Sequence, residues 1–169
     1  MRICLISDTH GFIDKKLFGY LESCDEVWHA GDIGSRYVLD EIGKHKPLKS
    51  VIGNIDNPRE MPEIPEDLMF DCEGLKILIT HIAGSPPNYN SRVRQLIADY
   101  KPDVLICGHS HILKVVRDSK YNLMFLNPGA CGNHGFHRMK TILRFTIDKG
   151  KMSNMEVVEL GRRGELASK

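Results

Sequence analysis

The chain has 169 residues, which is enough for one domain with a sizeable core of its own. Its 23 basic and 22 acidic residues leave a formal net charge of +1, and this balance disfavours a large nucleic-acid-binding face. No apolar stretch approaches membrane-spanning length, the N-terminal apolar run is too short for a signal peptide, and the five cysteines form no CxxC pair, so we expect a cytoplasmic protein with reduced thiols.

The first third of the chain alternates strand-like and helix-like segments. Apolar runs rich in β-branched residues predict strands at 2–7, 25–31 and 48–53. Apolar residues at helical spacing predict helices at 14–22 and 35–43, the second beginning at Ser35 as its N-cap and ending at Gly43. This alternation is typical of an α/β core.

The pattern changes after residue 66. A hairpin is predicted over 67–81 with its turn at Glu73-Gly74, followed by a helix at 90–100 and a strand at 103–108. A run of antiparallel strands is predicted from 112 to 160, so we expect a mixed sheet with a second sheet packed beside it in a single domain over 1–160. Residues 161–169 carry no apolar pattern and are expected to be a frayed tail.

Polar side chains follow five of the predicted strands at the point where each strand ends. They are Asp8 and His10, Asp32, Asn54, His81, and finally His109 and His111. In an open α/β sheet, ligands bind beyond the carboxyl ends of the strands. Alternate residues of an extended chain point the same way, so each pair spaced two apart is expected to grip a ligand from one side. Gly31, Gly53 and Gly108 precede candidate ligands and allow the backbone to approach closely.

The residue types indicate which ligand these side chains hold. Asp and Asn alone are more often turn residues, but four histidines at strand ends have no such explanation. Seven groups exceed what one four- to six-coordinate ion uses, which implies two ions, and mixed carboxylate, amide and imidazole ligands suit Mn²⁺, Ni²⁺, Fe²⁺ or Zn²⁺ better than Mg²⁺ or Ca²⁺. Two ions that share a carboxylate activate a bridging water and clamp the oxygens of an in-line displacement, which is the chemistry of phosphoester hydrolysis.

These motifs, in this order, resemble those of the calcineurin-like metallophosphoesterase superfamily. The chain's size and the short interval from GHSH to Asn127-Pro128-Gly129 resemble the small YfcE-like phosphodiesterases of that superfamily. The resemblance implies a four-layer α/β/β/α sandwich of two mixed sheets flanked by helices, the metallo-dependent phosphatase fold. It also implies hydrolysis of small phosphodiesters by attack of a metal-bridging hydroxide, with two divalent ions for which Mn²⁺ is the first expectation.

The same resemblance implies a role for each ligand. The first ion would be bound by Asp8, His10 and His111, and the second by Asn54, His81 and His109. Asp32 would bridge the two ions. Asp32, Asn54 and His109 are also expected to take part in catalysis.

One position departs from the family pattern. Many members have a histidine after the Asn of the Gly-Asn motif, where it is thought to protonate the leaving group, whereas this chain has Ile55. A positioned acid typically contributes about 10²–10⁴-fold, so we expect better activity on aryl or otherwise activated diesters than on alkyl monoesters. Asp56 is a candidate substitute acid, although an Asp before Asn-Pro is more often a turn residue.

Other polar residues have a functional and a structural interpretation. The stretch 131–138 is expected to be a glycine-rich substrate loop rather than a third metal site, with His134 or His137 reaching a substrate oxygen. Arginine suits phosphate binding, yet exposed helical arginines are usually just solvated; the candidates are Arg36, Arg92 and Arg94. His29 and His45 are expected to be structural.

Two other functions compete with the hydrolase. A non-catalytic metal-binding scaffold, like the retromer subunit that shares this fold, is favoured mildly by Ile55, while the complete set of seven ligands argues against it. A nuclease of the same superfamily is disfavoured by the balanced charge and the short chain. We therefore expect a small-molecule phosphoester as substrate, with no nucleic-acid or membrane partner, and the oligomeric state stays open, a homo-oligomer included.

Overall fold

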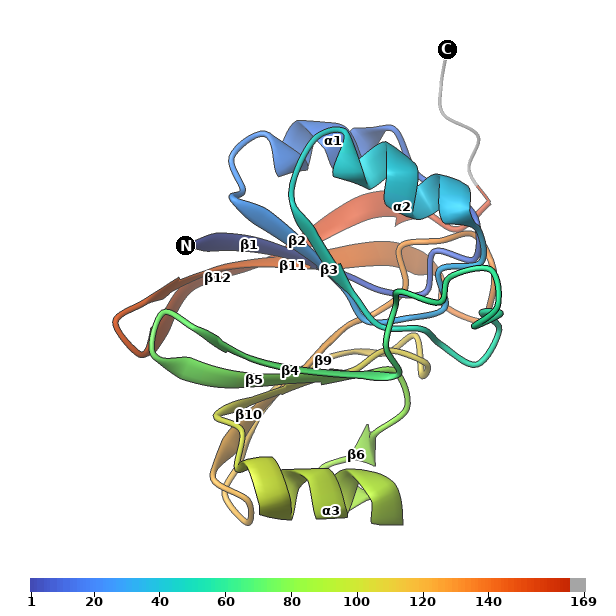
Figure 1. Ribbon diagram of the computed structural model, residues 1–169. Helices are drawn as coiled ribbons and strands as arrows, with labels where there is room; N and C mark the ends of the chain where they lie inside the picture. Colours follow the sequence, from blue (N-terminus) through green and yellow to red (C-terminus); the bar gives the residue numbers. More distant parts are fainter. Residues whose placement is uncertain (165–169) are drawn as a thin grey trace.

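The computed structural model describes residues 1–164 and consists of two five-stranded sheets stacked face to face (Figure 1). The first sheet has the spatial order β12 (Lys151–Arg162), β11 (Met139–Asp148), β1 (Arg2–Ile6), β2 (Glu26–His29) and β3 (Leu48–Ser50). The second has the order β4 (Asp67–Cys72), β5 (Leu75–Thr80), β8 (Val104–Ile106), β10 (Leu123–Pro128) and β9 (Leu113–Asp118). The remaining elements are the helices α1 (Lys16–Leu21), α2 (Arg36–Gly43) and α3 (Ser91–Tyr100), and a small hairpin of β6 (Gly84–Ser85) and β7 (Asn88–Tyr89).

Both sheets are mixed. In the first sheet β1, β2 and β3 are parallel, β11 pairs antiparallel with β1, and β12 pairs antiparallel with β11. In the second sheet β5, β8 and β10 are parallel, while β4 and β9 pair antiparallel at the two edges. Each sheet therefore has a parallel centre whose strands all end on the same side.

Three apolar cores hold four layers together. Neighbouring residues of a strand point to opposite faces, so Cys4 and Ile6 of β1 pack beneath α1 and α2 while Ile3 and Leu5 pack between the sheets. A third core lies between the second sheet and α3. Figure 1 shows α1 and α2 covering one outer face of the stack and α3 covering the other. The expected four-layer α/β/β/α sandwich is confirmed.

The local signals for helix ends and turns agree with the structure. The Ser35 side chain caps α2 by accepting a hydrogen bond from the backbone N–H of Tyr37 at 3.3 Å. The hairpin of β4 and β5 turns at Glu73-Gly74, where both residues have positive φ. The expected secondary structure therefore holds for the helices and for this hairpin.

The C-terminal strands differ from the expectation in two respects. They form two hairpins in different sheets, because β10 pairs with β8 and β9 whereas β11 crosses to β1 and β12. β12 also extends to Arg162, which pairs with Met139, so the strand continues into the segment expected as a tail. The absence of an apolar pattern at residues 161–162 did not reveal the strand, because the end of this edge strand is held by backbone hydrogen bonds to β11 rather than by buried side chains. Residues 165–169 of that expected tail lie outside the described part of the chain.

All five cysteines are buried and free of disulfides, as expected from their spacing. Within residues 1–164, no helix combines the length and the apolar character needed to cross a membrane.

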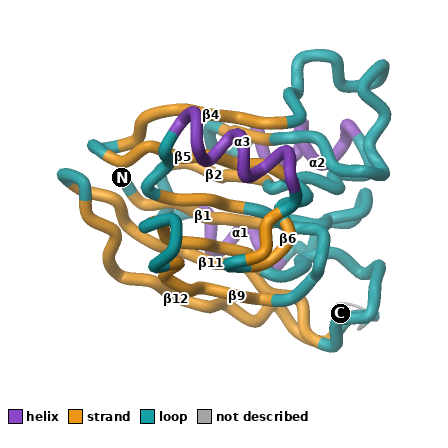
Figure 2. Tube along the Cα trace, turned by 90° about the horizontal axis from the view of Figure 1, so that it is seen from below, coloured by secondary structure: helices purple, strands orange, loops and turns teal. Residues whose placement is uncertain are grey.

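The loops that follow the parallel strands gather at one end of the molecule. Figure 2 shows these loops together on the right, at the end away from the turns of the β4–β5 and β11–β12 hairpins. The loop 129–138, which follows β10, joins the loops after β1, β2, β3, β5 and β8 there because β10 is parallel to β8. The two sheets thus present their strand ends to a common space.

Candidate metal centre

Seven polar side chains from the strand ends converge in two groups. The first group is Asp8, His10 and His111, the second is Asp32, His81 and His109, and within each group the ligand atoms lie within 4.8 Å of one another. Asn54 joins the second group, since its Oδ1 lies 3.2 Å from His81 Nε2 and 2.8 Å from His109 Nδ1. Each group draws residues from both sheets, because three of the loops leave the first sheet and the loops after β5 and β8 leave the second. The structure brings together all seven residues expected as ligands.

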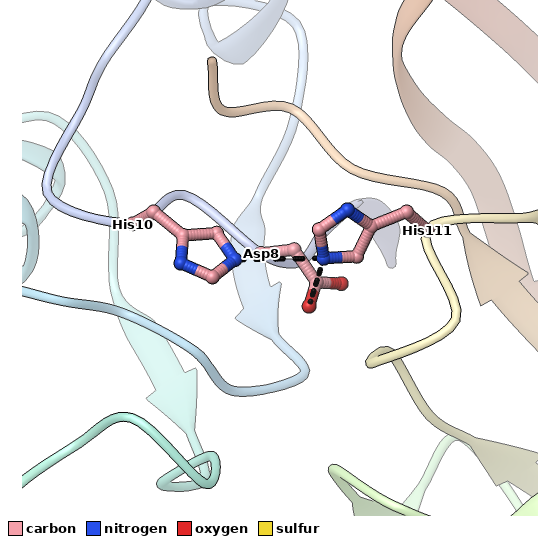
Figure 3. A group of neighbouring side chains, drawn as sticks. All are labelled: Asp8, His10 and His111. Carbon is pink, nitrogen blue, oxygen red and sulfur yellow. Dashed lines mark hydrogen bonds and ion pairs between the residues drawn. The ribbon is translucent and has the colours of Figure 1, made fainter. Parts of the chain in front are cut away.

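In the first group, two imidazoles flank a fully buried carboxylate (Figure 3). His111 Nε2 lies 3.2 Å from Asp8 Oδ1, and His10 Nε2 lies 3.4 Å from His111 Nε2. Asp8 is held in place by the backbone N–H of His109, at 3.2 Å from each carboxylate oxygen. Two ring nitrogens and a carboxylate oxygen thus face one another at distances that a shared cation would satisfy.

Asp32 lies between the two groups. Its Oδ1 is 3.1 Å from His81 Nε2 in the second group, and its Oδ2 is 3.6 Å from His10 Nε2 in the first. The backbone N–H of Ile55 donates to Oδ1 at 3.2 Å and fixes the carboxylate orientation. The two oxygens of one side chain therefore face different groups, which is the arrangement required of a bridging carboxylate.

The charges in the centre favour bound cations. Burial acts to raise the pKa of Asp32, but the hydrogen bond and charge of His81 outweigh it and hold that pKa below its usual value. Burial lowers the pKa of His10 despite the nearby carboxylates, so this ring is neutral and its nitrogen lone pair is free to bind a metal. Burial also acts to lower the pKa of His81, but Asp32 and Asp8 raise it overall, so the place beside these carboxylates favours positive charge.

The backbone at the centre is unusual, since five of the seven residues have positive φ. They are Asp8 (54°), His10 (48°), Asp32 (55°), His109 (66°) and His111 (57°). Such left-handed conformations cost non-glycine residues on the order of 1–3 kcal/mol each and cluster at functional sites. The expectation that the pairs spaced two apart grip from an extended chain is therefore wrong. Their side chains converge because the backbone turns sharply at each member.

The three glycines expected to allow close approach are confirmed in that role. A Cβ added to Gly31 would lie 2.6 Å from His81 Nδ1, and one added to Gly53 would lie 2.1 Å from Asp32 Oδ1. At Gly108 it would lie 1.9 Å from Ser7 Oγ. These glycines are required because the ligand loops pack directly on them.

Backbone carbonyls fix which ring nitrogen of two histidines faces the centre. His81 Nδ1 lies 2.7 Å from the carbonyl oxygen of Ala30 and donates to it, so Nε2 is the nitrogen that faces Asp32 and the centre. For His111 the effect is indirect: His137 Nε2 donates to the carbonyl oxygen of Gly132 at 3.0 Å, so His137 Nδ1 accepts from His111 Nδ1 at 3.3 Å. His111 Nε2 is then free to bind a metal beside Asp8.

The loop 131–138 therefore supports the candidate ligand His111. Gly135 packs against His111 so closely that an added Cβ would lie 2.1 Å from its Nδ1. His137, expected as a substrate contact, instead contacts a ligand, a role that the sequence did not reveal. His134 is exposed, and its ring centroid lies 4.8 Å from that of His10, so it lines the same cleft.

His29 and His45 are structural, as expected. His29 is fully buried, and burial lowers its pKa to about 4. Its Nδ1 accepts from the backbone N–H of Gly31 at 3.2 Å and its Nε2 donates to Thr9 Oγ1 at 2.9 Å, which joins the loops after β1 and β2. The His45 ring packs on Phe18 with centroids 4.5 Å apart.

Asp56 is used to hold loops together. Its carboxylate accepts three backbone N–H groups at 2.7–3.0 Å, from Ile33, Gly34 and Gly53. Both oxygens are occupied and the side chain is buried, which supports the turn interpretation rather than the acid. The loops after β2 and β3, which carry Asp32 and Asn54, are tied together by this contact.

The three candidate arginines lie in different surroundings. Arg36 forms ion pairs with Glu63 and with Asp40, on the exposed side of α2. Arg94 donates to the carbonyl oxygen of Tyr89 at 2.8 Å. Only Arg92, among these three, lines a pocket that includes Asn54 and His81, and its guanidinium also pairs with Asp67. Arg36, expected to contact substrate, is thus engaged with carboxylates outside the cluster.

A cleft of about 440 Å³ opens onto the two groups. Besides ligands, its lining includes Ile55, Ile112, His134 and Phe136, and the Phe136 ring is fully exposed. Ile55, which stands where many relatives of the expected family have a histidine, is 46% exposed on this rim. The cleft therefore combines a polar, ligand-rich floor with an apolar edge.

Comparisons with known proteins agree with this geometry. The model of the calcineurin-like phosphoesterase superfamily domain matches residues 1–150. A curated "Probable metallophosphoesterase" from Methanothermobacter thermautotrophicus is 30% identical over 135 residues, which is 77% of each chain.

Two solved structures share the fold. One is an archaeal phosphodiesterase, 24% identical, with a TM-score of 0.69 over 94% of this chain and 100% of the other. The other is Vps29 from Entamoeba histolytica in complex with Zn²⁺, 18% identical, with a TM-score of 0.74 over 95% of this chain and 100% of the other. At these identities the similarity shows the fold alone.

Proposed function

The chain belongs to the calcineurin-like phosphoesterase superfamily, and on this premise we propose that it is a dinuclear-metal-dependent phosphodiesterase acting on small phosphodiesters. The observation that carries the proposal is the position of Asp32, whose two oxygens face the two ligand groups at 3.1 and 3.6 Å. A carboxylate placed in this way can serve two ions at once.

The donor set fits two divalent ions. Asp8, His10 and His111 would hold one ion, and Asn54, His81 and His109 the other, with Asp32 shared. Mixed oxygen and imidazole donors suit Mn²⁺, which we propose as the bound metal, with Ni²⁺, Fe²⁺ and Zn²⁺ compatible with the same donors. Two such metal ions, when bound, would lower the pKa of a bound water and neutralise charge on the phosphoryl oxygens.

The chain's own residues prepare the site for this chemistry. Asp32 is ionised because its pKa is lowered, and His81 and His111 turn Nε2 towards the centre because their other nitrogens donate hydrogen bonds. At Ile55 the chain offers no proton to a departing alkoxide. Substrates whose leaving groups need no proton, such as aryl diesters, are therefore favoured.

The test is metal loading followed by turnover. Protein stripped with a chelator and reloaded with Mn²⁺, Ni²⁺, Mg²⁺ or Zn²⁺ is expected to bind two ions per chain and to hydrolyse bis-p-nitrophenyl phosphate, fastest with Mn²⁺. Asp32→Asn is expected to lose more than about 100-fold in kcat/KM, because it removes the shared ligand. Asp40→Asn, on the exposed surface of α2, is the matched control and should retain full activity. Protein that binds no ions under these conditions contradicts the proposal.

A metal-binding scaffold without turnover is the second candidate. The observation in its favour is Ile55, which leaves the cleft without an imidazole at the position usual in the family. Two bound ions with no hydrolysis of any phosphoester tested would support the scaffold and reject the hydrolase.

A further inference from the structure

A second pocket adjoins the metal centre, and the chemistry described so far does not use it. It has a volume of about 330 Å³ and lies between the segments 82–85 and 108–112. It shares His109, Ser110 and Ile112 with the cleft above the ligand groups, so the two spaces adjoin along one short segment. A molecule bound to the ligand groups can therefore extend into this pocket, which we call the side pocket.

The walls of the side pocket are apolar. Ile82, Ala83 and Phe125 contribute to them, together with Ile112, whose side chain is 66% exposed. A large aliphatic side chain so exposed beside a polar cluster is typical of ligand sites, which combine apolar walls with few polar groups. The pocket therefore offers apolar contact directly beside the candidate metal centre.

Asn127, the most deeply buried polar side chain of the lining, has both of its N–H donors engaged within the protein. Asn127 Nδ2 donates to the carbonyl oxygen of Gly108 at 2.8 Å and to Ser110 Oγ at 3.1 Å, and its Oδ1 accepts from the N–H of Gly129 at 2.9 Å. A polar substituent that entered the pocket would lose its water without finding a partner at this residue. This wall of the pocket, formed by Asn127 beside Phe125, therefore favours apolar groups.

One cation contributes to the lining. Lys114 Nζ bonds to Ser85 Oγ at 2.6 Å, and within the described residues it has no carboxylate partner. An unpaired ammonium group favours an anionic ligand. A phosphodiester carries one negative charge together with two ester substituents, so a single ligand of this class satisfies both the apolar walls and the cation.

We propose that the side pocket binds the retained ester substituent of the substrate, and that this substituent is an aryl or similarly flat apolar group. The inference rests on the proposed function. The retained rather than the leaving substituent is assigned because Phe125 and Asn127 in the lining are each only 2% exposed, so this part of the pocket is buried, whereas a leaving group needs a path to solvent. A monoester has no such substituent, so the pocket also makes diesters the preferred class.

The test holds the leaving group constant. Bis-p-nitrophenyl phosphate, methyl p-nitrophenyl phosphate and p-nitrophenyl phosphate all release p-nitrophenolate and differ only in what remains on phosphorus. We expect kcat/KM for the bis-aryl ester to exceed that for the methyl ester by at least about tenfold, since even one methylene in an apolar pocket is worth about 10- to 200-fold. Ile112→Ser and Ile82→Ser should each reduce this aryl-to-methyl ratio by about threefold or more. Val115→Ser is the matched control, because Val115 is an exposed β-branched residue outside the lining, and it should leave the ratio unchanged.

A binding measurement separates failure of the pocket from failure of the proposed function. Calorimetry on the metal-loaded protein should show diphenyl phosphate binding more tightly than dimethyl phosphate, and Ile112→Ser should reduce the difference. Turnover with equal rates on the aryl and methyl esters, or a ratio that both isoleucine variants leave unchanged, overturns the pocket and leaves the hydrolase intact. If none of the three esters is hydrolysed, the hydrolase fails and calorimetry alone decides the pocket, which is rejected if diphenyl phosphate shows no advantage.

Discussion

Replacement of His137 by alanine tests whether the loop 131–138 controls metal binding. The side chain accepts from His111 Nδ1 at 3.3 Å and donates to the carbonyl oxygen of Gly132 at 3.0 Å, and within residues 1–164 it forms no hydrogen bond with another candidate ligand. In His137→Ala, the His111 ring loses the partner that selects its tautomer and orientation. We expect the first ligand group to bind metal less tightly while the second is unaffected.

The size of the effect follows from the geometry. Loss of a residue that orients a metal-bound histidine typically costs about 10- to 100-fold in metal affinity. The nitrogen–nitrogen distance of 3.3 Å is long for a hydrogen bond and His137 is only partly buried, so we expect the lower end, about tenfold. Tenfold corresponds to about 1.4 kcal/mol.

The assay is a titration of chelator-stripped protein with Mn²⁺, with free Mn²⁺ followed by electron paramagnetic resonance. His137→Ala should weaken one of the two binding steps, and His137→Gln, which keeps an acceptor and a donor, should recover part of the loss. His134→Ala is the control from the same loop, since the exposed His134 contacts His10 only through its ring. Two wild-type binding steps in His137→Ala would refute the hydrogen-bond chain from Gly132 to His111.

Three further outcomes are expected. Gly53→Ala should abolish binding of both ions, because its Cβ would lie 2.1 Å from the shared Asp32 carboxylate; two ions bound per chain in a folded variant, by metal analysis, would contradict this. Ile55→His should raise kcat on alkyl-leaving esters by about 10²-fold or more while changing aryl esters little, as rates across leaving groups of graded pKa will show. His29 is fully buried, and its pKa is about 4 in the folded protein against about 6.5 in the unfolded chain. Between pH 4 and pH 6.5 the folded state therefore binds fewer protons than the unfolded state. Stability should therefore fall as pH drops from 6.5 towards 4, with about 2 kcal/mol lost between pH 7 and 5 in urea unfolding of metal-free protein, and His29→Gln should remove most of that loss.

The sequence was sufficient to predict which residues form the centre. Polar side chains that follow parallel strands of one sheet must meet at one end of that sheet, and this placed Asp8 with Asp32 in the first sheet and His81 with His109 in the second. The role of the glycines could also be predicted, because a glycine directly before a candidate ligand, as at Gly31 and Gly53, indicates a close backbone approach.

The sequence did not predict how those residues converge. Left-handed backbone at Asp8 and His10 depends on hydrogen bonds from their N–H groups to the carbonyl oxygens of Gly31 and Asp32, both at 3.0 Å, and these partners lie more than twenty residues away. The contact of His137 with His111 depends likewise on the loop that runs from β10 in the second sheet to β11 in the first and bonds to the loop after β1. Tertiary contacts of this kind leave no periodic pattern in the chain.

The crossing of the chain between sheets was missed for a related reason. Two consecutive hairpins have the same strand and turn signals whether they share a sheet or not. β11 lies in the first sheet beside β1, and from there its apolar residues Leu143 and Phe145 pack into the core between the sheets. Which sheet a strand joins is decided by this packing rather than by its own composition.

Because each ligand group takes members from both sheets, a bound ion would act as a cross-link between the two halves of the sandwich. Thermodynamic linkage is reciprocal. If bound ions stabilise the stacking of the two sheets, then correct stacking raises the affinity for the ions by the same free energy. A small sliding of one sheet over the other would pull Asp8 and His10 away from His111 without breaking any strand. Trp28 is fully buried in the core between the sheets and is not itself a candidate ligand, so it is expected to affect metal binding through the stacking of the sheets. A smaller side chain in place of that indole should lower the affinity for the cations under conditions in which the protein is still folded.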